Sequence, residues 1–184
     1  MPNHCDNDLV VRGPTAEVKR FLAEIVDEDS ASDCRNATID CEKILPYPDI
    51  FKALDAMSKA WEKEALQREA AGERVDRKKS PKDGFNCGGE DWKSETWGSK
   101  WGAYNGSPLK FKEGKKVSEV QLRFDTAWSP LSEGLYQRLS KMFPTLKITN
   151  RYFEAGMSFK GELIAEGGEI VSHWDAAYKG RRGG

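Results

Sequence analysis

The clearest feature of the chain is a two-residue alternation of apolar and polar side chains in its C-terminal half. Residues 120–128 place the following side chains on one face: Val120, Leu122, Phe124, Thr126 and Trp128. Similar alternation runs through residues 146–154 and 157–165, with Gly156 at the turn between them, and residues 170–174 follow as an edge strand. The pattern predicts an antiparallel sheet with one buried face.

Two other segments carry apolar side chains at helical spacing. The first stripe consists of Val18, Phe21, Leu22, Ile25 and Val26. The second consists of Leu131, Leu135, Leu139 and Met142. Such stripes are typical of amphipathic helices that bury one side. Thr15 is suited to cap the first helix, and Ser129 with Pro130 is suited to start the second.

The N-terminal part adds strands at residues 8–12 and 37–45 and a helix from about Asp49. Strand, helix and strand therefore alternate in both halves, which predicts an α+β fold with helices on one face of an antiparallel sheet. A ferredoxin-like split β-α-β topology is the simplest one that fits. We expect a single domain over residues 1–178.

Residues 62–90 form a charged helical insertion or linker within that domain. The helix leading into it should pack inward with Ile50, Leu54, Met57, Trp61 and Ala65. Residues 77–84 have no apolar face, and a solvated loop is favoured there over an anion site. Asp91 is suited to cap a short helix that Gly98 ends, and a strand is expected at residues 100–104. The tail, residues 179–184, reads as disordered.

Composition restricts the classes of function. Lys and Arg total 29 and Asp and Glu total 30, so the formal net charge is -1. This balance argues against a general nucleic-acid coat or a membrane-surface protein, which need a basic footprint. The N-terminus has no signal-peptide pattern and no apolar run reaches the length of a membrane span, so we expect a cytoplasmic protein.

Catalytic and metal-binding patterns are lacking in the sequence. The four cysteines, Cys5, Cys34, Cys41 and Cys87, show no C-x-x-C spacing and are expected to be free thiols. The histidines are His4 and His173, and His4 should point to the opposite face of its strand from Cys5. We therefore expect no cofactor, no metal and no catalytic set.

A candidate binding surface combines charged and aromatic residues. Its predicted members are Trp97, Lys100, Trp101, Arg123, Asp125, Arg151 and Glu154. The four charged side chains on the sheet strands would form a patch on the face away from the helices, bordered by the tryptophans. Aromatic residues with arginine are common interface anchors. The alternatives are cross-strand ion pairs on an exposed face and tryptophans packed in the core.

Several short segments occur in an order that resembles a known family. They are MPNHCDN at residues 1–7, LVVRGP at 9–14, ILPYP at 44–48, WGSKW at 97–101, FDTAWSP at 124–130 and RYFEAG at 151–156. Together they resemble the YubB ferredoxin-like domain family, which tailed phages and conjugative plasmids carry. The family pattern has tryptophan where this chain has His4, so a packing role at that position does not carry over.

The family has no established catalytic activity to transfer to this chain. What the resemblance implies about function comes from the phages and plasmids that carry the family. The resemblance implies a non-catalytic accessory protein that acts in the host cytoplasm and inhibits an anti-phage defence system, such as CRISPR-Cas, by binding a host protein. Two alternatives remain open. One is a nucleic-acid-binding module, and the other is a sponge for a nucleotide immune signal, with tryptophan stacking the base and Arg123 or Arg151 meeting phosphate.

Overall fold

The computed structural model describes residues 3–29 and 36–180. The chain divides into two compact units, one formed by Met1–Pro46 with Ser94–Gly184 and the other by Tyr47–Lys93. Cys34 lies outside the described residues. So does most of the predicted tail at residues 179–184.

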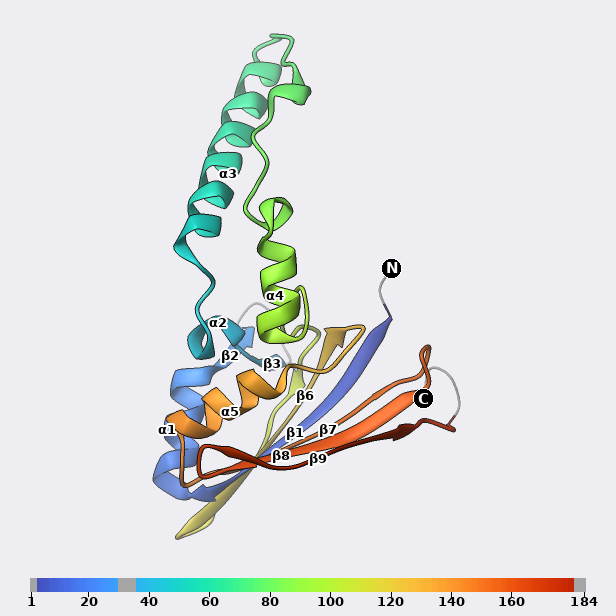
Figure 1. Ribbon diagram of the computed structural model, residues 1–184. Coiled ribbons are helices and arrows are strands. Elements are labelled where there is room, and N and C mark those ends of the chain that lie inside the picture. Colours follow the sequence, from blue (N-terminus) through green and yellow to red (C-terminus); the bar gives the residue numbers. More distant parts are fainter. Residues whose placement is uncertain (1–2, 30–35, 181–184) are drawn as a thin grey trace. The chain divides into compact units, whose positions relative to one another are not determined.

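The first unit contains, within the described residues, a six-stranded sheet in the order β5-β6-β1-β7-β8-β9 (Figure 1). Its strands are β1 (His4–Pro14), β5 (Lys110–Lys112), β6 (Val117–Ala127), β7 (Lys147–Glu154), β8 (Phe159–Glu166) and β9 (Glu169–Ala177). All neighbouring strands are antiparallel. Because β6 and β7 flank β1 and helix α5 connects them, they form the predicted split β-α-β unit.

Helices α1 (Thr15–Ile25) and α5 (Glu133–Met142) cover one face of this sheet, as Figure 1 shows. Alternate side chains of the strands are buried beneath them. In β6 these are Ser118, Val120, Leu122, Phe124 and Thr126. The predicted α+β architecture with helices on one face is therefore confirmed.

Both predicted helix starts need correction. Thr15 does not cap α1, because its hydroxyl donates to the Gly114 carbonyl over 2.8 Å and Pro14 occupies the cap position. Helix α5 begins after Ser132, whose Oγ accepts from the Leu135 amide over 3.1 Å. Ser129 is used elsewhere, since its hydroxyl donates to the Gly98 carbonyl over 2.6 Å.

A second sheet of the same unit has the order β2-β3-β4 within the described residues. Its strands are β2 (Val26–Asp29), β3 (Asn36–Ile39) and β4 (Ser107–Pro108). The strand expected at residues 37–45 ends at Ile39, because Asp40 caps the short helix α2 (Cys41–Ile44) by accepting from the Glu42 amide. The strand expected at residues 100–104 is also wrong, since Tyr104 makes only an isolated bridge to Asp125.

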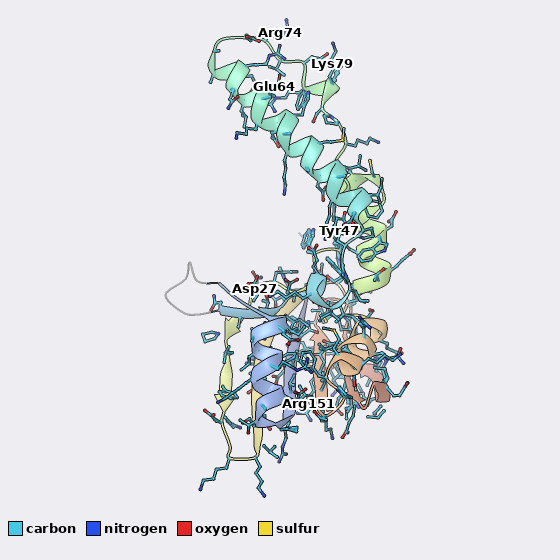
Figure 2. The ribbon with its side chains drawn as sticks, turned by 90° about the vertical axis from the view of Figure 1, so that its left-hand side faces the viewer. Asp27, Tyr47, Glu64, Arg74, Lys79 and Arg151 are labelled. Atoms are coloured by element: carbon cyan, nitrogen blue, oxygen red, sulfur yellow. The ribbon has the colours of Figure 1, made fainter. Side chains whose placement is uncertain are left out.

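The second unit holds helix α3 (Asp49–Ala70) and the short 3-10 helices η1 (Arg77–Lys79) and η2 (Phe85–Cys87). Helix α4 (Gly89–Trp97) begins here, so Asp91 lies in its first turn, and Gly98 ends it with φ of 83°. Figure 2 shows the charged side chains of this segment, among them Glu64.

The predicted inward stripe of α3 is wrong for Ile50 and Met57, which are exposed, whereas Ala65 is buried. The segment after α3 makes polar contacts with this helix. Asp55 Oδ1 accepts from the Gly84 amide over 2.8 Å, and Arg77 Nε donates to Glu69 Oε1 over 2.9 Å. Exposed ion pairs of this kind contribute little free energy.

Candidate functional site

The exposed face of the six-stranded sheet carries charged side chains in cross-strand rows. Asp8 on β1 lies between Arg123 on β6 and Arg151 on β7. In the next row, Asp6 on β1 lies opposite Phe153 on β7, which in turn faces Lys160 on β8. These side chains share a face because successive residues of a strand alternate between the two sides of a sheet.

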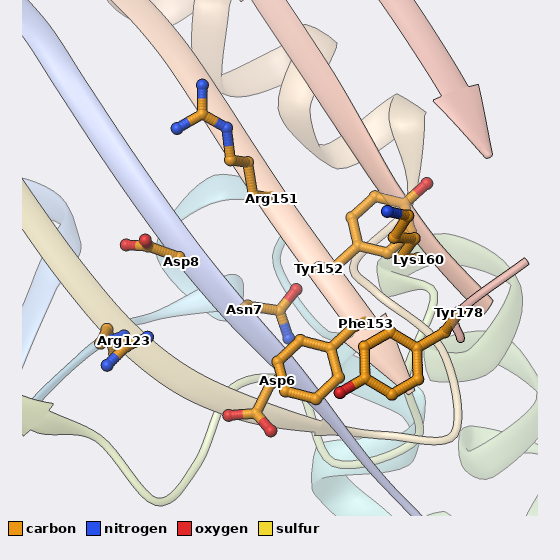
Figure 3. Close-up of a pocket in the computed structure, with 9 residues that line it drawn as sticks. All are labelled: Asp6, Asn7, Asp8, Arg123, Arg151, Tyr152, Phe153, Lys160 and Tyr178. Atoms are coloured by element: carbon orange, nitrogen blue, oxygen red, sulfur yellow. The ribbon is translucent and has the colours of Figure 1, made fainter. Parts of the chain in front are cut away.

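This face contains a pocket of about 240 Å³ (Figure 3). Its lining residues are Asp6, Asn7, Asp8, Arg123, Arg151, Tyr152, Phe153, Lys160 and Tyr178. The rings of Phe153 and Tyr178 are stacked with centroids 5.1 Å apart and form an aromatic wall. The Asn7 side chain turns to the helix-covered side, where its amide donates to Thr126 Oγ1 over 2.9 Å.

Some charges of the pocket are paired and others are not. Arg151 Nε donates to Glu162 Oε2 over 2.7 Å, and Asp8 Oδ1 accepts from the Gln121 amide over 2.7 Å. Arg123 and Lys160 have neither an ion pair nor a hydrogen bond to their cationic groups from any described residue. The pocket therefore presents two available cations.

The carboxyl group of Asp6 is electrostatically unusual within this pocket. Partial burial raises its pKa, and the neighbouring carboxylate of Asp125 raises it further. The charges of Arg123 and His4 act in the opposite direction. A hydrogen-bond donor or a cation placed beside Asp6 would relieve this repulsion.

Of the predicted patch, the structure places Arg123 and Arg151 in the pocket and Asp125 beside it. Asp125 Oδ2 accepts from the Asn105 side chain over 3.0 Å and lies 3.5 Å from His4 Nδ1. The Tyr104 hydroxyl also lies 3.1 Å from His4 Nδ1. Asp125 therefore belongs to a polar group at the end of β6.

The prediction that Glu154 joins the exposed patch is wrong. Glu154 is only 2% exposed and lies on the helix-covered face, because it is three positions after Arg151 and an odd offset along a strand reverses the face. Its carboxylate accepts from the Gly156 amide over 2.8 Å and also from the Met157 amide. Glu154 therefore holds the β7–β8 turn.

The predicted tryptophans have different environments. Trp97 is buried, and its Nε1 donates to the Leu45 carbonyl over 2.8 Å, so the alternative of core packing applies to it. Trp101 is 46% exposed and lies beside Trp128, which is 41% exposed, with ring centroids 6.4 Å apart. We call Trp101 and Trp128 the tryptophan pair. Lys100 Nζ lies 4.7 Å from the Trp101 centroid and 4.5 Å from that of Trp128.

Trp128 has an unusual backbone conformation. The alternation predicted a buried side chain, but β6 ends at Ala127 and Trp128 has φ of 63°. The Trp128 amide donates to the Asn3 carbonyl over 3.0 Å, which helps to hold this conformation. A bulky residue in the left-handed region is strained, and such strain often occurs at functional sites.

His4 and Cys5 are adjacent in sequence but do not form a catalytic pair. Cys5 is buried under the helices, and burial raises the pKa of its thiol to about 12. His4 is exposed on the other face, as predicted. In the described part of the chain, no group of three His, Cys, Asp or Glu side chains is arranged to hold a metal ion.

His173 takes part in a polar network that sequence patterns did not suggest. The Tyr152 hydroxyl donates to Asp175 Oδ1 over 2.6 Å and lies 2.7 Å from His173 Nε2, while His173 Nδ1 contacts Glu133. Burial, followed by the bond to Asp175, raises the pKa of Tyr152, so its phenol stays protonated. This network connects β7 and β9 to α5.

No helix in the described ranges combines the length and the apolar character that a bilayer crossing requires.

Comparison with known proteins supports the fold. Residues 96–181 match the family model described as a ferredoxin-like domain in Api92-like protein. The crystal structure of a protein api92 from Yersinia pseudotuberculosis is similar over 98% of this chain and 100% of that chain, with a TM-score of 0.54 and 12% sequence identity. No curated protein sequence matches the chain. The part from residue 96 onward is thus similar to the ferredoxin-like domain of Api92-like proteins, and the structural likeness concerns the fold alone.

Proposed function

We propose that the chain is a non-catalytic binding protein that docks a host protein on its tryptophan pair. The observation that carries the proposal is the exposure of Trp128 in a strained backbone conformation beside the exposed Trp101. Folding alone gives no advantage to an exposed tryptophan in the left-handed region, whereas tryptophan is among the strongest anchors of protein interfaces.

Neighbouring groups suit such an interface. Tyr104 packs edge-to-face against Trp101 with ring centroids 5.8 Å apart, and its hydroxyl reaches His4. Lys100 adds a cation between the two indoles. Large rigid rings surrounded by polar groups are the usual composition of an interface centre and its rim.

The class of partner is proposed from the resemblance of the sequence to the YubB family of phage and plasmid proteins. Accessory proteins of mobile elements act in the host cytoplasm, and blocking host immunity is a use for a binding protein without a catalytic set. We therefore infer that the partner belongs to an anti-phage defence system, with a CRISPR-Cas effector as the first candidate.

The test uses bacterial strains that each carry one defined defence system. The chain is expressed in each strain and the plating efficiency of a targeted phage is measured. The protein whose defence is suppressed is then purified, and its binding is measured directly. We expect one system to be suppressed, and the double variant W101A/W128A to lose both suppression and binding.

Trp174 provides the matched control, because it is 45% exposed but lies on β9, outside the tryptophan pair. The variant W174A should retain both suppression and binding. The proposal fails if no defence system is suppressed, or if W101A/W128A acts as well as the wild type.

A further inference from the structure

The pocket on the exposed sheet face has the chemistry of a small-ligand site. Neither residue of the tryptophan pair lines this pocket, so its role does not rest on the proposed partner. Most charged residues on a sheet face pair with one another. Here Arg123 and Lys160 form no ion pair with any described residue, so their charges are available to an anionic group of a ligand.

The cations lie at two ends of the pocket. Arg123 is on β6, whereas Lys160 is on β8 and is a diagonal neighbour of Arg151 on β7 (Figure 3). Three strand spacings separate β6 from β8, or about 14 Å, so Arg123 and Lys160 do not share one small anion. Arg151 Nε donates to Glu162, whereas its terminal nitrogens make no hydrogen bond to a described residue and remain available to an anion, as does Lys160.

The centre of the pocket is aromatic. Phe153 stands between Asp6 and Lys160 in its cross-strand row, and Tyr178 stacks on it. A planar ring of a ligand gains contact area against such a wall at little entropic cost. Nucleobases stack favourably on aromatic side chains, and the contact suits any base because every base has a π-face.

The acids lie at the side of Phe153 opposite Lys160. Asp6 and Asp8 are carboxylates on the same face of β1, and the only described hydrogen bond to either carboxylate is the one from Gln121 to Asp8. Carboxylates accept from adjacent donors on a base edge, and guanine presents two such donors side by side. A ligand with donors at one end and an anion at the other matches this arrangement of charges.

We propose that this pocket binds a guanine nucleoside monophosphate, with the base against Phe153, its donor edge toward Asp6 and Asp8, and its phosphate toward Lys160 and Arg151. The volume of about 240 Å³ lies just below the range of pockets for drug-sized ligands, so it suits one nucleotide and not a dinucleotide.

Calorimetric titration of the full chain with GMP tests the proposal, with AMP, CMP, UMP and inorganic phosphate as comparison ligands. We expect GMP to bind more tightly than the other monophosphates and far more tightly than phosphate. The variant K160A should weaken GMP binding by roughly tenfold or more, because it removes a charge-assisted contact. The variant F153L should weaken it as well by removing the ring.

Lys147 supplies the matched control, since it is an exposed lysine on β7 outside the pocket. K147A should bind GMP like the wild type, and so should W101A/W128A, which separates this proposal from the one on the host partner. The inference is overturned if GMP does not bind at millimolar concentration, if K160A and K147A bind equally, or if phosphate alone binds as tightly as GMP. Tight binding of guanine-containing single-stranded RNA without binding of free GMP would also overturn it.

Discussion

The left-handed conformation of Trp128 predicts an inverted order of stability for alanine and glycine at this position. With φ of 63°, any residue that has a Cβ atom is strained there, at a cost of about 1–2 kcal/mol. Both W128A and W128G remove the indole and its contacts with Trp101 and Lys100. Their difference therefore isolates the backbone term.

The expected magnitude is the balance of two effects. Glycine escapes the left-handed penalty, but it loses about 0.4–1 kcal/mol because its unfolded chain is freer. We therefore expect W128G to be more stable than W128A by about 0.5–1 kcal/mol. Urea unfolding measures this as a shift of the midpoint by a few tenths molar at an unchanged slope, given slopes of about 1–3 kcal/mol/M.

Trp101 is the internal control, because its φ is not positive and it lies in the same compact unit. At Trp101 the usual order should hold, with W101A more stable than W101G. If W128A is at least as stable as W128G, the backbone at Trp128 is not strained, and the observation that carries the docking proposal loses its force.

Three further predictions concern individual groups. Burial and the charge of Asp125 raise the pKa of Asp6 in the fold, so its ionisation opposes folding. The variant D6N should therefore be more stable than the wild type at pH 7, and this difference should vanish as the pH falls below the ordinary pKa range of Asp. Thermal unfolding measured across pH tests this. The buried thiol of Cys5, with its pKa raised to about 12, should alkylate far more slowly at pH 8 than the exposed Cys87, and equal rates in peptide-mapped mass spectrometry would contradict this. E154A should lose about 2–3 kcal/mol in urea unfolding because two turn amides lose a charged acceptor, whereas E166A at an exposed strand end should lose less than about 0.5 kcal/mol.

Periodicity was sufficient to predict the sheet, because alternation alone determines which side chains of a strand are buried. It assigned Leu122 and Phe124 to the core and Arg123 and Arg151 to the exposed face correctly. The same rule, applied strictly, would have placed Glu154 on the opposite face from Arg151. Nearness in sequence does not place two charged side chains on one face of a strand; an even spacing between them does.

The rest of the pocket depends on strand order, which periodicity does not determine. Lys160 lies beside Phe153 because β8 pairs with β7, and Tyr178, which directly follows β9, stacks on Phe153. Trp128 shows a second limit, since alternation holds only while the strand lasts. The Ser129–Pro130 segment after it was a signal that the chain turns there.

The stripe of α3 shows a third limit. Helical spacing predicts an apolar side, but burial needs a partner surface, and Ile50 and Met57 have none among the described residues. Asp55 instead accepts from the Gly84 amide, a polar contact that sequence spacing does not predict. Apolar residues at helical spacing therefore predict the helix α3 but not the burial of its apolar side.

Substitutions on the two faces of the sheet differ in how much folding free energy they remove. This difference determines whether a loss of binding can be separated from a loss of stability. On the helix-covered side, Glu154 and Asn7 are buried and hydrogen-bonded, so changes there remove folding free energy and would lower any binding indirectly. On the open side, Arg123 and Lys160 are exposed and have no ion partner among the described residues, and substitutions at such positions usually change stability by less than about 0.5 kcal/mol. A loss of ligand binding in K160A with unchanged unfolding therefore reports on the pocket itself and not on the fold.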